Sequence, residues 1–173
     1  MANTLTEFAY NREKAVAYAH KWAYRRNPAY LDFQELGGDC TNYASQCLFA
    51  GAGVMNYTPV YGWFYINGNN RTASWTGVQY FYNFLVGNVG VGPYAREVDI
   101  SEVQPGDFCQ LAIDRNEFHH TPVIVATGLE PNLSNILVSA HSRDADCRPL
   151  DTYQYRRLRF LHIEGVRTVV QEG

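Results

Sequence analysis

The sequence lacks any apolar run long enough to cross a membrane, since a transmembrane helix needs about 20 consecutive apolar residues. Its first residues, Met1 to Glu7, are polar and lack the apolar segment of a secretory signal peptide. Basic residues form no stripe, and the formal net charge is −3. We therefore expect neither a membrane nor a nucleic acid as a partner, and a cytoplasmic location by default.

The four cysteines contain no C-x-x-C pair, which makes a structural zinc site improbable. Cys40 and Cys47 lie on one expected helix, about 10 Å apart, which is too far for a disulfide. Cys109 and Cys147 come together only if the fold brings them there. We expect reduced thiols, no metal and no cofactor.

The sequence also lacks internal repeats and low-complexity linkers, so residues 1–173 are expected to form one domain. Helical periodicity dominates the first half and extended apolar runs the second, which indicates an α+β fold. The expected helices span 11–26, 40–50 and 76–86, with one helical turn at 99–103. The expected strands span 108–113, 121–127, 136–140 and 159–163.

The stretch Gly37-Gly-Asp-Cys40 precedes the second expected helix. Asp39 is a favoured N-cap residue, and Gly51 offers a C-terminal stop. Cys40 is then the first helical residue, where the helix dipole favours a thiolate over a thiol. This position suits a nucleophile, although an ordinary cap followed by a small buried residue gives the same pattern.

Two adjacent histidines, His119 and His120, open the apolar run at 121–127, and His141 ends the run at 136–140. A nucleophilic cysteine, a histidine base and a polar residue that orients the histidine are the groups needed for covalent acyl transfer. The chain therefore contains the residue types of a cysteine hydrolase.

Several segments in this order resemble the family named Putative amidase domain, within the papain-like cysteine peptidases that include NlpC/P60 and CHAP domains. The segments are YNREKAVAYAHKWA (10–23), GGDCTNYASQCL (37–48), SWTGVQYFYNFL (74–85), VQPGDF (103–108), HHTPVIVATG (119–128), SAHSRDADCRPL (139–150) and RFLHI (159–163). No single segment is decisive, but the ordered set covers nearly the whole chain.

The resemblance implies a papain-like (NlpC/P60-type) fold, with N-terminal helices packed on a C-terminal antiparallel sheet. It implies Cys40 as nucleophile and His120, rather than His119, as its base. His141 is the expected orienting residue, with Asp144 and Asp146 as alternatives. Gln34 stands six residues before Cys40, the spacing of an oxyanion-hole glutamine in papain-like peptidases. A solvated loop glutamine is the alternative interpretation of Gln34, and the Cys40 amide is the safer oxyanion donor.

A long aromatic segment, Gly53 to Ser74, joins the second and third expected helices. Such segments either wall a substrate groove or form a packed cover over the core. On the first interpretation, Trp63 and Trp75 bind substrate together with Asp39.

The implied substrate is a peptide or amide, with peptidoglycan-derived peptides as the leading hypothesis. Relatives often act at the bacterial cell wall, so a released or phage-associated protein is the alternative to a cytoplasmic one. Two further functions stay open: a catalytically silent module that binds a peptide or glycan, and a papain-like acyltransferase. A metal site built from Cys40, His120 and Cys147 is a more distant alternative.

Overall fold

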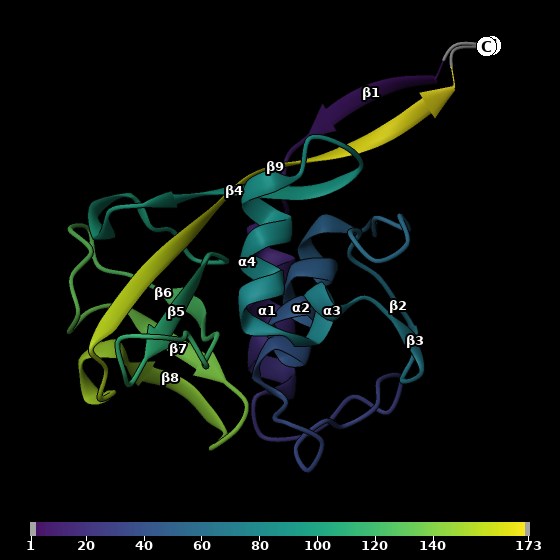
Figure 1. Ribbon diagram of the computed structural model, residues 1–173. Helices are drawn as coiled ribbons and strands as arrows, with labels where there is room; N and C mark the ends of the chain where they lie inside the picture. The colour runs from purple at the N-terminus through teal and green to yellow at the C-terminus, as the bar shows by residue number, and fades with distance from the viewer. Residues whose placement is uncertain (1–2, 172–173) are drawn as a thin grey trace.

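The computed structural model describes residues 3–171 (Figure 1). The helices are α1 (Arg12–Trp22), α2 (Cys40–Ala52), α3 (Ala73–Thr76) and α4 (Val78–Gly87), with single 3-10 turns at Ile100–Glu102 and Leu150–Thr152. The strands are β1 (Asn3–Phe8), β2 (Tyr65–Asn67), β3 (Asn70–Arg71), β4 (Gly92–Val98), β5 (Phe108–Ala112), β6 (Val123–Ala126), β7 (Leu137–Ala140), β8 (Ala145–Pro149) and β9 (Arg157–Gln171). The helices pack against an antiparallel sheet, which confirms the predicted α+β class. None of these helices is long and apolar enough to cross a membrane.

The sheet has the strand order β1-β9-β5-β6-β7-β8, and β4 also pairs with β9. The long strand β9 is therefore the centre of the topology, since it contacts β1, β4 and β5. β6 and β7 run antiparallel with Val123 opposite Ser139, so the start of β6 and the end of β7 lie at the same end of the two strands. His120, just before β6, and His141, just after β7, lie at this end.

Both faces of the sheet are covered. Phe108, Val123 and Leu161 point into the larger core with α1, α2 and α4. Their neighbours along the strands point into a second core, which includes Cys109, Ile124 and Phe160. Because successive side chains on a strand point to opposite faces, burial of both faces explains why these strands are continuously apolar.

The first half of β9 belongs to the body, whereas its second half pairs with β1 in a two-stranded ribbon that extends away from it (Figure 1). Every residue of β1 is exposed. The strands β1, β2, β3, β4 and β8 were not predicted, and only residues 159–163 of β9 were expected to be extended.

The expected helix ends need correction. α1 ends at Trp22 rather than at residue 26, and the ring of His141 hydrogen-bonds the Trp22 carbonyl. α2 continues to Ala52, and Gly53, with a φ of 73°, forms its left-handed C-cap. Gly51 serves a different purpose, because a Cβ there would lie 2.4 Å from the Tyr10 ring. The expected helix 76–86 corresponds to α4, which begins at Val78, and the short helix α3 lies just before it.

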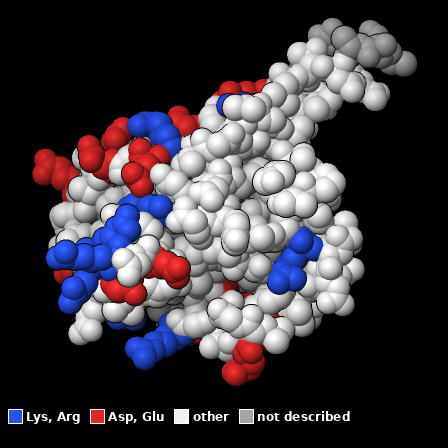
Figure 2. Space-filling model, viewed as in Figure 1, with Lys and Arg blue, Asp and Glu red and all other residues white. Residues whose placement is uncertain are grey.

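Charge is distributed unevenly over the surface. Between Asp39 and Arg96 the only charged residue is Arg71. Figure 2 shows the result: the side of α2, α3, α4 and the β2–β3 hairpin is almost uncharged, whereas basic and acidic groups gather over the sheet.

Candidate active site

Cys40 is the first residue of α2, as expected, and its side chain is half-buried. The chain reaches it through Gly37 and Gly38, both at a φ of 106°, a backbone conformation that favours glycine. The sulfur lies 3.7 Å from the Thr41 hydroxyl and 3.8 Å from the His119 carbonyl oxygen. Burial raises the pKa of the Cys40 thiol, and the hydrogen bonds from Thr41 and from the Thr121 amide only partly oppose it. Burial therefore opposes the thiolate that the helix N-terminus would favour.

A cavity of about 600 Å³ brings Cys40 together with His119 and His120. The His120 ring is half-buried and packs near Tyr153, with ring centroids 5.7 Å apart. Burial lowers the pKa of His120 to about 4, and the nearby His119 and Arg148 add to the effect. His120 is therefore neutral at pH 7 and able to accept a proton.

His119 is the more exposed of the two histidines, and its Nδ1 accepts a hydrogen bond of 3.4 Å from the Ile113 amide. Within residues 3–171, no hydrogen bond joins the Cys40 sulfur to either imidazole. The preference for His120 as the base thus stays a prediction.

Two threonines hold the nucleophile helix to the histidine-bearing segment. Thr41 follows Cys40 and Thr121 follows His120, and their hydroxyl oxygens are 3.1 Å apart. Gln110 on β5 donates a second hydrogen bond to Thr121, at 3.3 Å. All three side chains are buried. This polar cluster fixes the spacing between the two backbones that carry Cys40 and His120.

His141 is fully buried, and both of its ring nitrogens have partners. Nδ1 lies 2.6 Å from Asp39 Oδ2, and Nε2 lies 2.8 Å from the Trp22 carbonyl oxygen. The ring also stacks on Tyr43, with centroids 4.0 Å apart. Within residues 3–171, no hydrogen bond joins His141 to the His120 ring, so its orienting role stays a prediction.

The two alternative orienting residues also have other partners. Asp144 accepts two hydrogen bonds from Arg26, at 2.8 and 3.1 Å. Asp146 lies 2.7 Å from His20 Nδ1. Neither carboxylate hydrogen-bonds His120.

Asp39 does not cap α2 through its side chain, contrary to expectation. Burial alone would raise the pKa of Asp39, but hydrogen bonds from His141, Asn42 and the Phe33 amide outweigh it and leave this pKa below its ordinary value. Asp39 is 1% exposed, so it is placed to hold His141 rather than to bind substrate.

Gln34 is exposed, and its Oε1 accepts a hydrogen bond of 2.9 Å from the Ser142 hydroxyl. Ser142 lines the cavity, whereas Gln34 does not. An oxyanion role for Gln34 stays a prediction, and the Cys40 amide is the donor closer to the sulfur.

The substrate-binding interpretation of Trp63 and Trp75 is wrong for this structure, because both side chains are fully buried. Their rings pack together with centroids 4.7 Å apart. Trp63 donates to the Ser45 hydroxyl and Trp75 to the Asn42 side-chain oxygen, both residues of α2. The aromatic segment covers the core at this point.

Arg143, Arg148 and Tyr153 also line the cavity and were not predicted as site residues from the sequence. Arg148 stacks on the Tyr153 ring at 3.8 Å and donates to Thr152. Within residues 3–171, neither arginine pairs with a carboxylate. The Tyr153 hydroxyl is the only buried side-chain oxygen or nitrogen of the described residues without a hydrogen-bond partner. Only the positions of Arg143 and Arg148 inside a family segment hinted at this wall.

Comparison with known proteins supports the resemblance. The chain is 37% identical over 123 residues to Uncharacterized protein YhbB of Bacillus subtilis (strain 168). The match covers 69% of this chain but only 38% of that relative. No solved structure matches the chain. The family model described as Putative amidase domain matches residues 9–163, and the chain therefore belongs to this family.

Proposed function

We propose that this protein hydrolyses an amide bond, with Cys40 as nucleophile and His120 as general base. The observation that carries the proposal is the shared cavity: Cys40 at the start of α2 and His120 before β6 line it together. Membership of a family named for amidases agrees with this chemistry. We further propose that the chain is one papain-like domain of the NlpC/P60 type, because a helix-borne cysteine facing a strand-borne histidine is what that fold implies.

The two pKa shifts favour a neutral resting pair. Burial keeps the Cys40 thiol protonated and His120 unprotonated near pH 7. His120 takes the thiol proton as the sulfur attacks the carbonyl carbon, and the Cys40 amide binds the oxygen that becomes negative. His120 then protonates the leaving nitrogen, and a thioester on Cys40 results.

Water completes the cycle. His120 removes a proton from a water molecule, whose oxygen attacks the thioester carbonyl, and Cys40 leaves with that proton as a thiol. A carboxylic acid is released. Because no hydrogen bond joins sulfur and imidazole in the free protein, the two groups must approach when substrate binds, as catalytic hydrogen bonds often tighten only then.

The cavity wall suggests a substrate that carries a carboxylate. Arg143 and Arg148 line it without a carboxylate partner within residues 3–171. Arginine binds carboxylates through paired, charge-assisted hydrogen bonds. The orphan Tyr153 hydroxyl offers one further donor on the same wall. Peptides derived from peptidoglycan bear such carboxylates next to amide bonds, which makes them the leading substrate class.

The test measures release of free amine from a panel of such peptides by the wild type and by Cys40→Ala. We expect the substitution to reduce kcat by about 10⁴-fold or more, because no other group forms the thioester. Full activity in Cys40→Ala would overturn the proposal. Adding amine nucleophiles to the assay separates hydrolysis from acyl transfer, since a transferase would yield the new amide.

A second measurement does not need the substrate. Iodoacetamide labelling, with each modified cysteine identified by mass spectrometry, is compared between the wild type, His120→Ala and the matched control His119→Ala. We expect Cys40 to label faster than the buried Cys47 and Cys109, and to slow only in His120→Ala. Equal Cys40 rates in all three proteins would show that His120 does not activate the thiol in the free protein, and the activity of Cys40→Ala would then decide between catalysis and ligand binding.

A further inference from the structure

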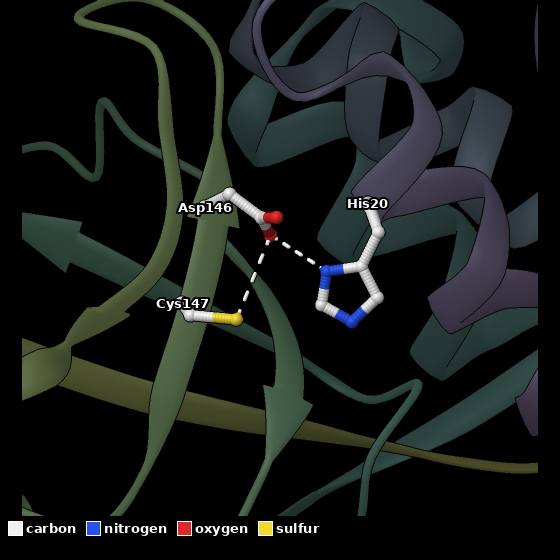
Figure 3. A group of neighbouring side chains, drawn as sticks. All are labelled: His20, Asp146 and Cys147. Carbon is white, nitrogen blue, oxygen red and sulfur yellow. Dashed lines mark hydrogen bonds and ion pairs between the residues drawn. The ribbon is translucent and has the colours of Figure 1, made fainter.

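His20 in the last turn of α1 and two consecutive residues of β8 bring three metal-binding atoms together (Figure 3). The donor atoms of His20, Asp146 and Cys147 all lie within 4.8 Å of one another. Within residues 3–171 no other group of this kind occurs. It is distinct from the cavity of Cys40, whose lining includes none of the three residues. We propose that this cluster binds a borderline divalent cation of the Zn²⁺ type.

The backbone of β8 is shaped to place both of its residues on one side. Successive residues of a regular strand point to opposite faces, so neighbours do not normally share a ligand. Here Val138 pairs with Arg148 and Ala140 with Ala145, which leaves Asp146 and Cys147 opposite Ser139 alone. This is a β-bulge, a feature that redirects side chains. In Figure 3 both side chains leave β8 toward α1.

Cys147 occupies a position where glycine is the ordinary residue. Its φ is 56°, in the left-handed region that side chains with a Cβ disfavour. Such strained positions persist where the surrounding structure enforces them, and they concentrate at functional sites. A glycine would form the same bulge without strain but would lack the thiol, so the cysteine has a use here beyond shaping the turn.

The donor set suits zinc better than magnesium or calcium. Imidazole nitrogen, thiolate sulfur and carboxylate oxygen are all zinc ligands, whereas magnesium and calcium prefer oxygen alone. Donors at zinc distances in a tetrahedron lie roughly 3.3–3.8 Å apart. The nitrogen–oxygen separation of 2.7 Å and the sulfur–oxygen separation of 3.8 Å need only small side-chain rotations to match.

The surroundings already orient the carboxylate. The buried Ser139 hydroxyl donates to Asp146 Oδ1, and the Asp146 amide donates to the Tyr24 hydroxyl at 3.1 Å. Hydrogen bonds of this kind are typical around metal ligands. The His20 side chain is 41% exposed, which leaves the fourth coordination position open to water. On binding, the cation replaces the proton of the Cys147 thiol, which passes to the buffer.

The bound cation would join α1 to the β7–β8 hairpin. The turn of this hairpin carries His141, Ser142 and Arg143, and the last two line the cavity of Cys40. A bound cation would therefore stabilise the cavity wall that Ser142 and Arg143 form. The cation site does not depend on the proposed hydrolysis, and each proposal can fail alone.

The test titrates the full chain with Co²⁺, in a non-thiol reductant, and follows the absorption band of a thiolate bound to cobalt. Zn²⁺ then competes with cobalt for the site. We expect one ion per chain in the wild type and a raised melting temperature with Zn²⁺. Cys147→Gly should lose the thiolate band and bind Zn²⁺ at least about 100-fold more weakly, since loss of even an outer partner costs about 10–100-fold.

The glycine variant is its own folding control, because it relieves the left-handed strain and should melt no lower than the wild type without metal. His20→Asn should weaken binding to a similar degree while keeping the thiolate band, and Cys40→Ala should bind as the wild type does. The proposal is overturned if the wild type gives no thiolate band, if Cys147→Gly binds Zn²⁺ equally well, or if the band depends on Cys40.

Discussion

Two histidines lie at the same end of neighbouring strands, His120 before β6 and His141 after β7, but they differ in burial and in hydrogen bonding. The ring nitrogens of His141 contact Asp39 and the Trp22 carbonyl, and its ring is buried against Tyr43. His120 shares an open cavity with a cysteine and two arginines, and its pKa is lowered to about 4. Full pairing is what a structural polar residue needs, whereas a base must have a nitrogen available. The comparison favours a structural role for His141 and agrees with the proposed catalytic role of His120.

The largest expected effect is on catalysis by His120→Ala. Loss of a general base reduces the rate by roughly 10²–10⁴-fold. The free energy of unfolding should change by less than about 1 kcal/mol, because the half-buried ring has no fixed structural partner. Activity on a carboxylated peptide and urea denaturation measure the two quantities. A matched control, His119→Ala, should retain activity within a few-fold, and an equal loss in both variants would contradict the assignment.

His141→Ala is expected to act on stability instead. It leaves the buried carboxylate of Asp39 without its closest partner, and leaving a buried charged group short of a hydrogen bond costs about 1–3 kcal/mol or more. Urea denaturation at neutral pH measures this loss. The exposed pair of His20 and Asp146 provides the control, since His20→Ala should cost no more than about 1 kcal/mol. If the two substitutions cost the same, His141 is not a structural residue.

The pH dependence of activity tests the role of His120 without a substitution. Because His120 has a pKa of about 4, its basic form dominates above that value, and kcat/KM should rise near pH 4 rather than near 6.5. An acidic limb with a midpoint near 6.5 would show that His120 is not the base. The lowered pKa of Asp39 affects stability: its contribution is present above about pH 3.9 and is lost as the pH falls through the folded pKa.

Much of the fold could be predicted, because its helices and central strands carry strong periodic or apolar patterns. The ribbon formed by β1 and the end of β9 could not, since every residue of β1 is exposed and no buried face marks it. β8 was missed because the bulge at Asp146 and Cys147 interrupts its alternation. The helix end at Trp22 depends on His141, which comes 119 residues later.

The site was predictable in part. A glycine-rich turn before a helix singled out Cys40, and two histidines before an apolar strand singled out His119 and His120; the structure places all three on one cavity wall. The partner of His141 is Asp39, 102 residues away, and no local spacing reveals such a pair. The substrate-binding interpretation of Trp63 and Trp75 was wrong because both indole N–H groups donate hydrogen bonds to residues of α2. Both side chains can therefore be fully buried without contact to solvent or substrate.

The smallest expected effect concerns recognition rather than chemistry. Arg148→Gln should raise KM for a carboxylated peptide by about tenfold, equivalent to about 1.4 kcal/mol, and leave kcat nearly unchanged. The same peptide with its carboxylate amidated should show no such difference between the two proteins. Because Arg148 also lowers the pKa of His120, the substitution should move the acidic limb of the pH profile slightly upward. A loss of kcat with both peptides would instead place Arg148 in the catalytic step and bring the cavity wall into the chemistry of His120.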